Sequence, residues 1–159
     1  MTWKVVLGAA VGSEVGQRAV SPQAKEPMVY ANQVRVLIVD DEPSLCKALT
    51  MALSLAGYDV IAALSGESAL AIVRNEHVDV MLVDLRIPDM RGDIVFETAA
   101  GYQPHLRYQT LFMTGDITDR GHKFIAACNC HFLRKPFDLR DMTDAIAALA
   151  PRNVRDAAG

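Results

Sequence analysis

The sequence lacks the features that mark several classes of protein. No uninterrupted apolar run reaches the roughly 18 residues that a membrane-spanning helix needs. There are only three cysteines, Cys46, Cys128 and Cys130, an odd number without the pattern of a disulfide framework. Positive charge is not in excess, with 16 Lys and Arg against 19 Asp and Glu, so a general affinity for nucleic acid is not indicated. What is abundant is apolar residues, 51% of the chain of 159, which suffices for the core of one domain.

The few cysteines fit a reducing cytoplasm, and we expect them to be ordinary core and loop residues. Cys128, Cys130 and His131, with His122 nearby, could be read as a metal clip, but their spacing is wrong for the usual zinc pairs. The N-terminus has neither the basic leader nor the cleavage pattern of a signal peptide, so export is not expected. A cytoplasmic protein is therefore predicted.

The chain divides into three parts by composition. Residues 1–33 form an N-terminal extension that ends in the linker-like segment SPQAKEP at 21–27, and we expect them to be mobile. Met28 is an alternative start of the chain. Residues 34–150 carry regular apolar periodicity and form the predicted domain, and 151–159 are a polar tail.

Within 34–150, short apolar runs alternate with segments of helical periodicity. Strands are predicted at 34–39, 58–63, 78–84, 108–113 and 130–134. Helices are predicted from Pro43 to about 56, from the N-cap Ser65 to about 74, at 93–100, at 119–127 and after the capping residue Asp138. This alternation is typical of an α/β fold in which right-handed crossovers join parallel strands and helices cover both faces.

Four of the predicted strands end on polar residues that suit one kind of chemistry. Asp40 and Asp41 follow the first strand, Asp84 the third, Thr114 the fourth and Lys135 the fifth. Because the strands are parallel, these ends meet at one edge of the sheet, where ligands bind in such folds. Three carboxylates together are tolerable around a divalent cation, and oxygen ligands suit Mg²⁺. A hydroxyl and an ammonium opposite the metal suit a phosphoryl group.

The segment from 34 to about 150 resembles the receiver domain of two-component response regulators. The matching motifs are VDDE at 39–42, LVDLRIPDMRG at 82–92, MTG at 113–115 and KPF at 135–137, in this order and spacing. The resemblance implies a flavodoxin-like (βα)5 three-layer sandwich with strand order 2-1-3-4-5, an order for which a chemotaxis receiver is a standard example.

The resemblance also implies a role for each matching residue. Asp84 would be the phosphoacceptor. Magnesium would be held by Asp84, by Asp41 directly, by Asp40 largely through water, and by the backbone carbonyl of Arg86. Thr114 and Lys135 would hold the phosphoryl oxygens, and the Lys135–Pro136 bond would be cis. Phe132, three residues before Lys135, occupies the position of the aromatic switch, which turns inward when Thr114 moves toward the phosphoryl group.

The implied partners follow from the same resemblance. A histidine kinase or a histidine phosphotransfer protein would donate the phosphoryl group. A downstream protein would then bind the surface formed by the fourth helix, fifth strand and fifth helix. Residues 151–159 are too few for a helix-turn-helix reader, so we expect a single-domain regulator without an output domain, no direct DNA binding and no membrane association. No turnover of an external substrate is expected.

Two other interpretations use the same residues. A haloacid-dehalogenase-type phosphohydrolase also has an aspartyl nucleophile after a strand, but its motif is similar to D-x-D, and Arg86 replaces the second acid here. A pseudo-receiver would bind partners without phosphorylation, although every site residue is present. Any one of these aspartates alone would be read as a helix cap or turn residue. Asp116 and Arg91 are expected at the surface. Arg86, beside the site, is a candidate for controlling the lifetime of the phosphorylated state.

Overall fold

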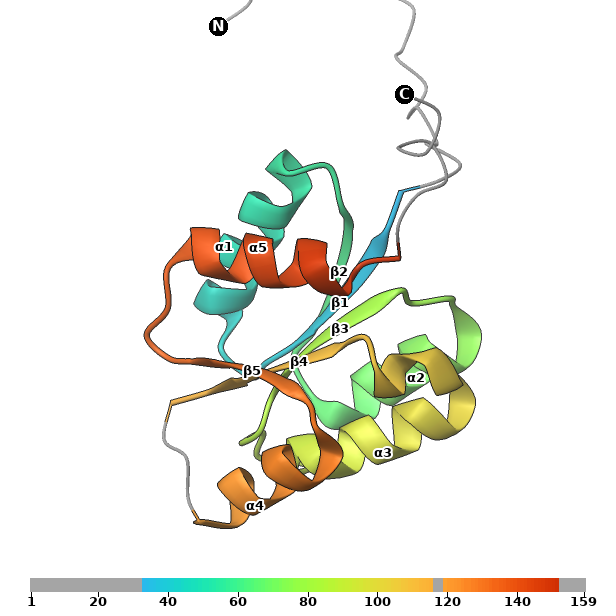
Figure 1. Ribbon diagram of the computed structural model, residues 1–159. Helices are drawn as coiled ribbons and strands as arrows, with labels where there is room; N and C mark the ends of the chain where they lie inside the picture. The colour runs from blue at the N-terminus through green and yellow to red at the C-terminus, as the bar shows by residue number, and fades with distance from the viewer. Residues whose placement is uncertain (1–32, 116–118, 152–159) are drawn as a thin grey trace, which may run out of the picture. The chain divides into compact units, whose positions relative to one another are not determined.

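A five-stranded parallel sheet organises the computed structural model, which describes residues 33–115 and 119–151 (Figure 1). The strand order is β2-β1-β3-β4-β5. The strands are β1 (Arg35–Val39), β2 (Asp59–Ala63), β3 (Val80–Asp84), β4 (Thr110–Thr114) and β5 (His131–Arg134). The helices are α1 (Pro43–Leu55), α2 (Gly66–Asn75), α3 (Gly92–Tyr102), α4 (Asp119–Cys128) and α5 (Leu139–Leu149), with a 3-10 turn η1 (Pro104–Arg107) before β4. The predicted flavodoxin-like topology is confirmed.

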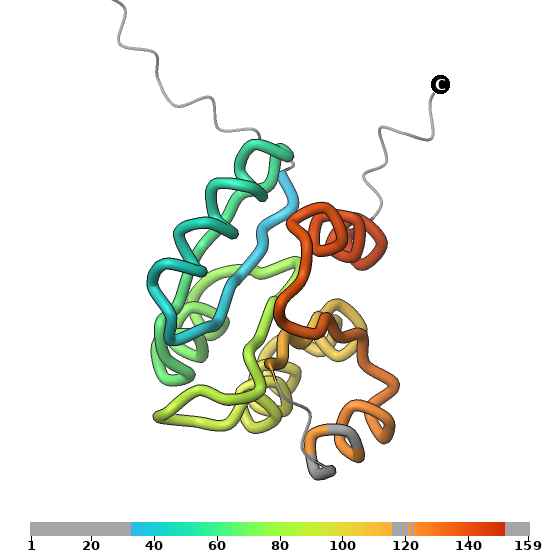
Figure 2. The backbone as a smooth tube through the Cα atoms, turned by 90° about the vertical axis from the view of Figure 1, so that its left-hand side faces the viewer, coloured from blue at the N-terminus to red at the C-terminus, as the bar shows by residue number. Residues whose placement is uncertain are grey.

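The sheet separates two apolar layers, as the alternation of side chains along a strand requires. Val36, Ile38, Val80 and Leu82 point toward α1 and α5. Their neighbours along the strands point to the other face, where α2, α3 and α4 cover the sheet (Figure 1). β1, β3 and β4 lie between other strands and are almost wholly buried, which explains their continuous apolar sequence. Figure 2 shows the chain running from α4 (orange) through β5 into α5 (red) along one side of the domain.

Most helix boundaries follow the predicted signals. Ser65 is the N-cap of α2, and its hydroxyl oxygen accepts a hydrogen bond from the backbone N–H of Ser68. Pro43 begins α1, and Gly57, with φ of 94°, follows its end in the left-handed region. Asp138 stands at the N-cap of α5 as predicted, but its side chain makes no capping hydrogen bond.

The third helix and the fourth strand differ from the prediction, and the third strand begins at Val80, two residues later than predicted. The helix runs to Tyr102 rather than 100, because Gly101 does not interrupt it and Pro104 begins the separate turn η1. The strand then begins at Thr110, two residues late, since Tyr108 belongs to the end of that turn and is 78% exposed. Among the described residues no helix is long and apolar enough to cross a membrane. The predicted extension and tail lie almost wholly outside the described residues.

No feature of the sequence indicated a disulfide, and the expectation that Cys128 and Cys130 are ordinary core and loop residues is wrong in this respect, because the structure joins them in one. Asn129 between them has φ of 53°, in the left-handed region. The turn brings the two Cα atoms to 5.2 Å, within the range a disulfide spans. Cys46 is the free cysteine, buried on α1. Spacing alone does not reveal such a turn.

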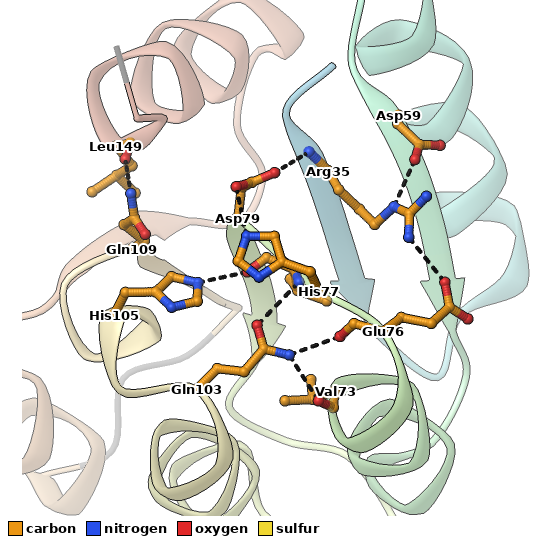
Figure 3. A network of polar contacts seen from close by, with 11 residues as sticks. Arg35, Asp59, Val73, Glu76, His77, Asp79, Gln103, His105, Gln109 and Leu149 are labelled. Atoms are coloured by element: carbon orange, nitrogen blue, oxygen red, sulfur yellow. Dashed lines mark hydrogen bonds and ion pairs between the residues drawn. The ribbon is translucent and has the colours of Figure 1, made fainter. Parts of the chain in front are cut away.

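The amino ends of the strands are joined by side-chain hydrogen bonds (Figure 3). The Arg35 guanidinium pairs with Asp59 on β2 and with Glu76 after α2, while its backbone N–H donates to Asp79 before β3. The amide of Gln103 donates to the carbonyls of Val73 and Glu76, and accepts from the N–H of Val78. These contacts satisfy the end of α2 and close the edge opposite the predicted site.

The loop after β3 is fastened to the start of α2 by one side chain. The two carboxylate oxygens of Asp89 accept hydrogen bonds from the backbone N–H groups of Gly66 and Glu67, each at 3.1 Å. These bonds lower the pKa of Asp89 below its ordinary value. A Cβ on Gly66 would lie 2.7 Å from that of Met90, so the two segments approach as closely as a glycine permits.

Replacing Asp89 by Asn should therefore lower the melting temperature in a pH-dependent way. Because the folded-state pKa of Asp89 is depressed, its stabilisation is present above the unfolded-state pKa and is lost as pH falls through the folded-state value. Thermal unfolding from neutral to acidic pH should show a difference from wild type that shrinks as the pH falls. Asp144→Asn, on the exposed side of α5, is the matched control, and a pH-independent difference for Asp89→Asn would contradict the assignment.

Candidate functional site at the carboxyl edge of the sheet

The carboxyl ends of the strands bring together the polar residues singled out in the sequence. Asp84 and Thr114 are the last residues of β3 and β4, and Asp40 and Lys135 directly follow β1 and β5. Backbone hydrogen bonds continue past the strand ends at these positions, from Asp40 N–H to the carbonyl of Ala63 and from Lys135 N–H to that of Thr114. The site residues are therefore placed by the sheet itself, not by free loops.

The central contact of the site is made by the ammonium group of Lys135. Its Nζ atom donates to Oδ2 of Asp40 and to Oδ2 of Asp84, each at 2.6 Å. Asp40 is 1% exposed, and the side chains of Asp84 and Lys135 are 12% and 21% exposed. One cation thus joins two carboxylates that come from residues 95 and 51 positions earlier in the chain.

The remaining carboxylate oxygens accept hydrogen bonds from the backbone. Asp40 Oδ1 accepts from the N–H of Glu42 at 2.9 Å, and Asp84 Oδ1 accepts from the N–H of Arg86 at 2.8 Å. Each acid is thereby held by its own following loop on one oxygen and by Lys135 on the other. Such charge-assisted bonds orient both acids before any ligand arrives.

The environment keeps Lys135 positively charged. Burial lowers its pKa, but the hydrogen bonds and negative charges of Asp40 and Asp84 outweigh that effect and raise the pKa above the ordinary lysine value. At neutral pH the site therefore holds a fixed ammonium group beside the Asp84 carboxylate. This is the arrangement that stabilises negative charge arriving on a transferred group.

Carboxylate oxygens of Asp40, Asp41 and Asp84 all lie within 4.8 Å of one another. Oxygens at about 2.1 Å from Mg²⁺ are at most about 4.2 Å apart, so the cluster is close to the size that the ion requires. The donor set is all oxygen, which suits Mg²⁺ better than Zn²⁺. Three carboxyl groups around a single ammonium leave an excess of negative charge that a divalent cation would balance. The residues therefore fit the predicted metal.

The other predicted residues differ in burial and in their neighbours. Thr114 is 1% exposed at the end of β4. The Arg86 side chain is exposed, and its Nη2 atom would lie 3.8 Å from a Cβ on Gly115, so it reaches toward the loop after β4. Phe132 pairs in register with Phe112 and is 44% exposed on β5. Arg91 is exposed and pairs with Asp93, as a surface residue. Asp116 lies outside the described residues.

Two further residues beside the site had no role assigned from the sequence. A Cβ on Gly92 would lie 2.2 Å from the carbonyl oxygen of Asp84, so only glycine allows α3 to begin against the acid's backbone. The thiol of Cys46 lies 3.3 Å from the carbonyl oxygen of Asp40, and burial, followed by the Asp40 charge, raises its pKa to about 11. In the sequence, a glycine soon after the acidic end of a strand was a signal for Gly92. No sequence signal pointed to Cys46.

Comparison with known proteins agrees with this geometry. Residues 36–147 match the family model of the response regulator receiver domain. The chain is similar to the transcriptional regulatory protein TcrX of Mycobacterium tuberculosis, with 33% identity over 119 residues that cover 75% of this chain and 50% of TcrX. It is also similar to GlrR of Escherichia coli, with 35% identity over 114 residues, 70% of this chain and 25% of GlrR.

Solved structures give the same result. A CheY-like receiver domain protein from Methanospirillum hungatei superposes with a TM-score of 0.69 at 27% identity, covering 74% of this chain and 93% of that one. The chemotaxis protein CheY4 of Vibrio cholerae gives 0.67 at 25% identity, covering 74% and 99%. This chain belongs to the response regulator receiver domain family. It spans half or less of the length of curated relatives such as TcrX and GlrR.

Removing the central cation should destabilise the fold. In Lys135→Ala the buried carboxylates of Asp40 and Asp84 lose their shared partner. We expect a loss of about 2 kcal/mol in the free energy of unfolding, less than for a fully buried pair because Lys135 is partly exposed. Urea unfolding in the presence of a metal chelator measures it. Lys47→Ala, exposed on α1, is the matched control.

The double variant Lys135→Ala with Asp84→Asn should recover part of that stability, because one of the two uncompensated charges is removed. Equal stability of Lys135→Ala and wild type would show that the contacts of Lys135 with the two acids do not contribute to the free energy of unfolding.

Proposed function

We propose that the chain is a phosphoryl-accepting module of a two-component phosphorelay, in which Asp84 receives the group in a Mg²⁺-dependent transfer from a phosphohistidine. The observation that carries the proposal is the contact of Lys135 Nζ with Oδ2 of both Asp40 and Asp84 at 2.6 Å. It supports a site in which one carboxylate is the nucleophile while the ammonium and the second acid lie beside it. The proposed receiver domain covers residues 34–150, between the N-terminal extension 1–33 and the C-terminal tail 151–159.

The reaction exchanges one bond to phosphorus for another. An oxygen of the Asp84 carboxylate attacks the phosphorus, the phosphorus–nitrogen bond to the donor histidine breaks, and the imidazole leaves with the bonding electron pair and takes up a proton. Asp84 becomes an acyl phosphate. The backbone N–H of Arg86 orients the carboxylate by its bond to Oδ1, leaving Oδ2 on the side of Lys135.

Lys135 and Thr114 supply the contacts for the arriving phosphoryl oxygens. The ammonium of Lys135 provides a compact positive charge, and the Thr114 hydroxyl a hydrogen-bond donor. Bound Mg²⁺, held by Asp40, Asp41, Asp84 and the backbone carbonyl of Arg86, would supply additional neutralisation of the phosphoryl charge. Lys135 stands beside a cis peptide bond to Pro136, as the family resemblance implies.

The output step of the proposal links Thr114 with Phe132. When Thr114 moves toward the phosphoryl group, the Phe132 ring turns from its half-exposed position into the space released, changing the surface of α4, β5 and α5. Phe132 has no hydroxyl, so its two positions differ in packing alone. A histidine kinase or histidine phosphotransfer protein is the proposed donor, and a downstream protein is the proposed ligand of that surface. The module is proposed to act in the cytoplasm and to accept a phosphoryl group on its own side chain without turning over an external substrate.

Incubation with Mg²⁺ and a small phosphoryl donor such as phosphoramidate should phosphorylate the chain at Asp84. Intact-mass spectrometry should show one added phosphoryl group, absent in Asp84→Asn and in the presence of a chelator. Lys135→Ala should slow the reaction by on the order of 100-fold, the effect of removing one stabilising group. Absence of the adduct in wild type, with the chain folded, would favour the phosphorylation-independent pseudo-receiver. Turnover of small phosphate esters would favour the phosphohydrolase.

Arg86→Ala should shorten the lifetime of the phosphorylated state. The Arg86 guanidinium reaches toward Gly115 at the mouth of the site, where it can contact the phosphoryl group or obstruct an attacking water. We expect hydrolysis of the acyl phosphate to accelerate several-fold, on the scale of one lost charge-assisted hydrogen bond. The decay of the phosphorylated mass after removal of the donor measures it. Arg140→Ala, exposed on α5, is the control, and an unchanged decay rate would exclude Arg86 from this role.

A further inference from the structure

The turn that joins α4 to β5 is held both by a backbone hydrogen bond and by a disulfide. The backbone N–H of Cys130 donates to the carbonyl of Ile125 at 3.3 Å, and Asn129 adopts a left-handed conformation. Together they form a helix-ending turn of the kind that satisfies the last carbonyls of a helix. The disulfide between Cys128 and Cys130 closes the same turn. The turn is therefore complete without the disulfide.

This disulfide does not add much to the stability of the whole fold. Only one residue separates the two cysteines, so the bond removes little conformational freedom from the unfolded chain. Its influence is local, on the last turn of α4 and the first residues of β5. Cys128 Sγ also lies 3.4 Å from the carbonyl oxygen of Ile125, so the reduced thiol has an acceptor in place. Both the closed and the open state are thus accommodated by the surrounding structure.

The cysteine pair lies at the border between the core and the surface. Cys128 and Cys130 are half-buried and pack against the core beneath α4, whereas Asn129 and His131 beside them are exposed. Cys46 differs from this pair in exposure and in acidity. It is 3% exposed, and its burial and the Asp40 charge raise its pKa to about 11. Thiolate character and access decide which cysteines exchange. The chain therefore has one partly accessible cysteine pair and one inert cysteine.

We propose that Cys128 and Cys130 are a reversible thiol–disulfide site, whose reductant is a dithiol and whose oxidation state adjusts the α4–β5 turn. A thiolate of the dithiol attacks one sulfur, the bond between Cys128 and Cys130 breaks, and the released cysteine sulfur takes up a proton. The second thiol of the reagent displaces the other cysteine sulfur, which is protonated in turn. The dithiol loses two electrons and becomes a cyclic disulfide, and the cysteines gain them.

The cysteine pair lies close to the surface that carries Phe132. Phe132 stands two residues after Cys130 on the edge strand β5, exposed on the same face of the sheet as α4. A change in the turn therefore moves the start of the strand that carries Phe132. In a reducing compartment, a bond between two half-buried neighbouring cysteines of this kind forms transiently rather than as a permanent link.

The test uses the whole chain equilibrated in mixtures of reduced and oxidised dithiothreitol, followed by native alkylation with N-ethylmaleimide and peptide mapping. In oxidised mixtures all three cysteines should be protected. In reduced mixtures Cys128 and Cys130 should alkylate while Cys46 remains protected until the chain is denatured, and the change should be reversible with one midpoint. Alkylation of the pair in fully oxidised mixtures would overturn the proposal.

Stability and local hydrogen exchange complete the test. The melting temperature should change by only a few degrees on reduction, and the double variant Cys128→Ser with Cys130→Ser should fold and match the reduced chain. Amide exchange at 126–132 should accelerate on reduction and stay redox-independent in the double variant. Unfolding on reduction, or identical exchange in both states, would overturn the proposal. Because no phosphorylation is measured, failure here is separate from failure of the function proposed for Asp84.

Discussion

The domain depends on one ammonium group placed between two buried acids. Lys135 joins Asp40 to Asp84 across β1, β3 and β5, so three strands that are distant in the sequence are linked at their carboxyl ends. Removing the charges from water is costly, and the contact offsets that cost only because both acids also accept backbone hydrogen bonds. The same contact sets the charge of the site and fixes the direction of the Asp84 carboxylate. The atoms that link the three strands are therefore also the atoms of the candidate site.

The two edges of the sheet have different roles in the domain. At the amino edge, the Asp79 carboxylate accepts from the backbone N–H of Arg35, and the Gln103 amide bonds to backbone groups of the segment 73–78, which satisfies loop ends within the fold (Figure 3). At the carboxyl edge, the acids outnumber the lysine, and their oxygens fit a metal. A parallel sheet makes this division available, because every strand begins at one edge and ends at the other. The amino edge therefore closes the fold, and the carboxyl edge carries the candidate site.

Sequence periodicity predicted the order of the elements and the family motifs predicted the strand order, since buried parallel strands and amphipathic helices leave distinct patterns. The residues at the strand ends could be singled out because their types are rare there in combination. Geometry that depends on loop conformation could not be predicted in this way. Asp89 capping α2, the disulfide of Cys128 with Cys130, and the missing cap bond of Asp138 all depend on how turns fold back.

Gly92 shows how such a site constrains the evolution of its neighbours. Its α carbon faces the carbonyl oxygen of Asp84 so closely that even a methyl group would meet it at 2.2 Å. The position carries no charge and takes part in no chemistry, yet the smallest possible enlargement would push the helix away from the acid. Mutational tolerance there is limited by volume alone. A substitution at this one position could therefore displace the proposed phosphoacceptor, Asp84, while every acidic residue and the lysine stayed intact.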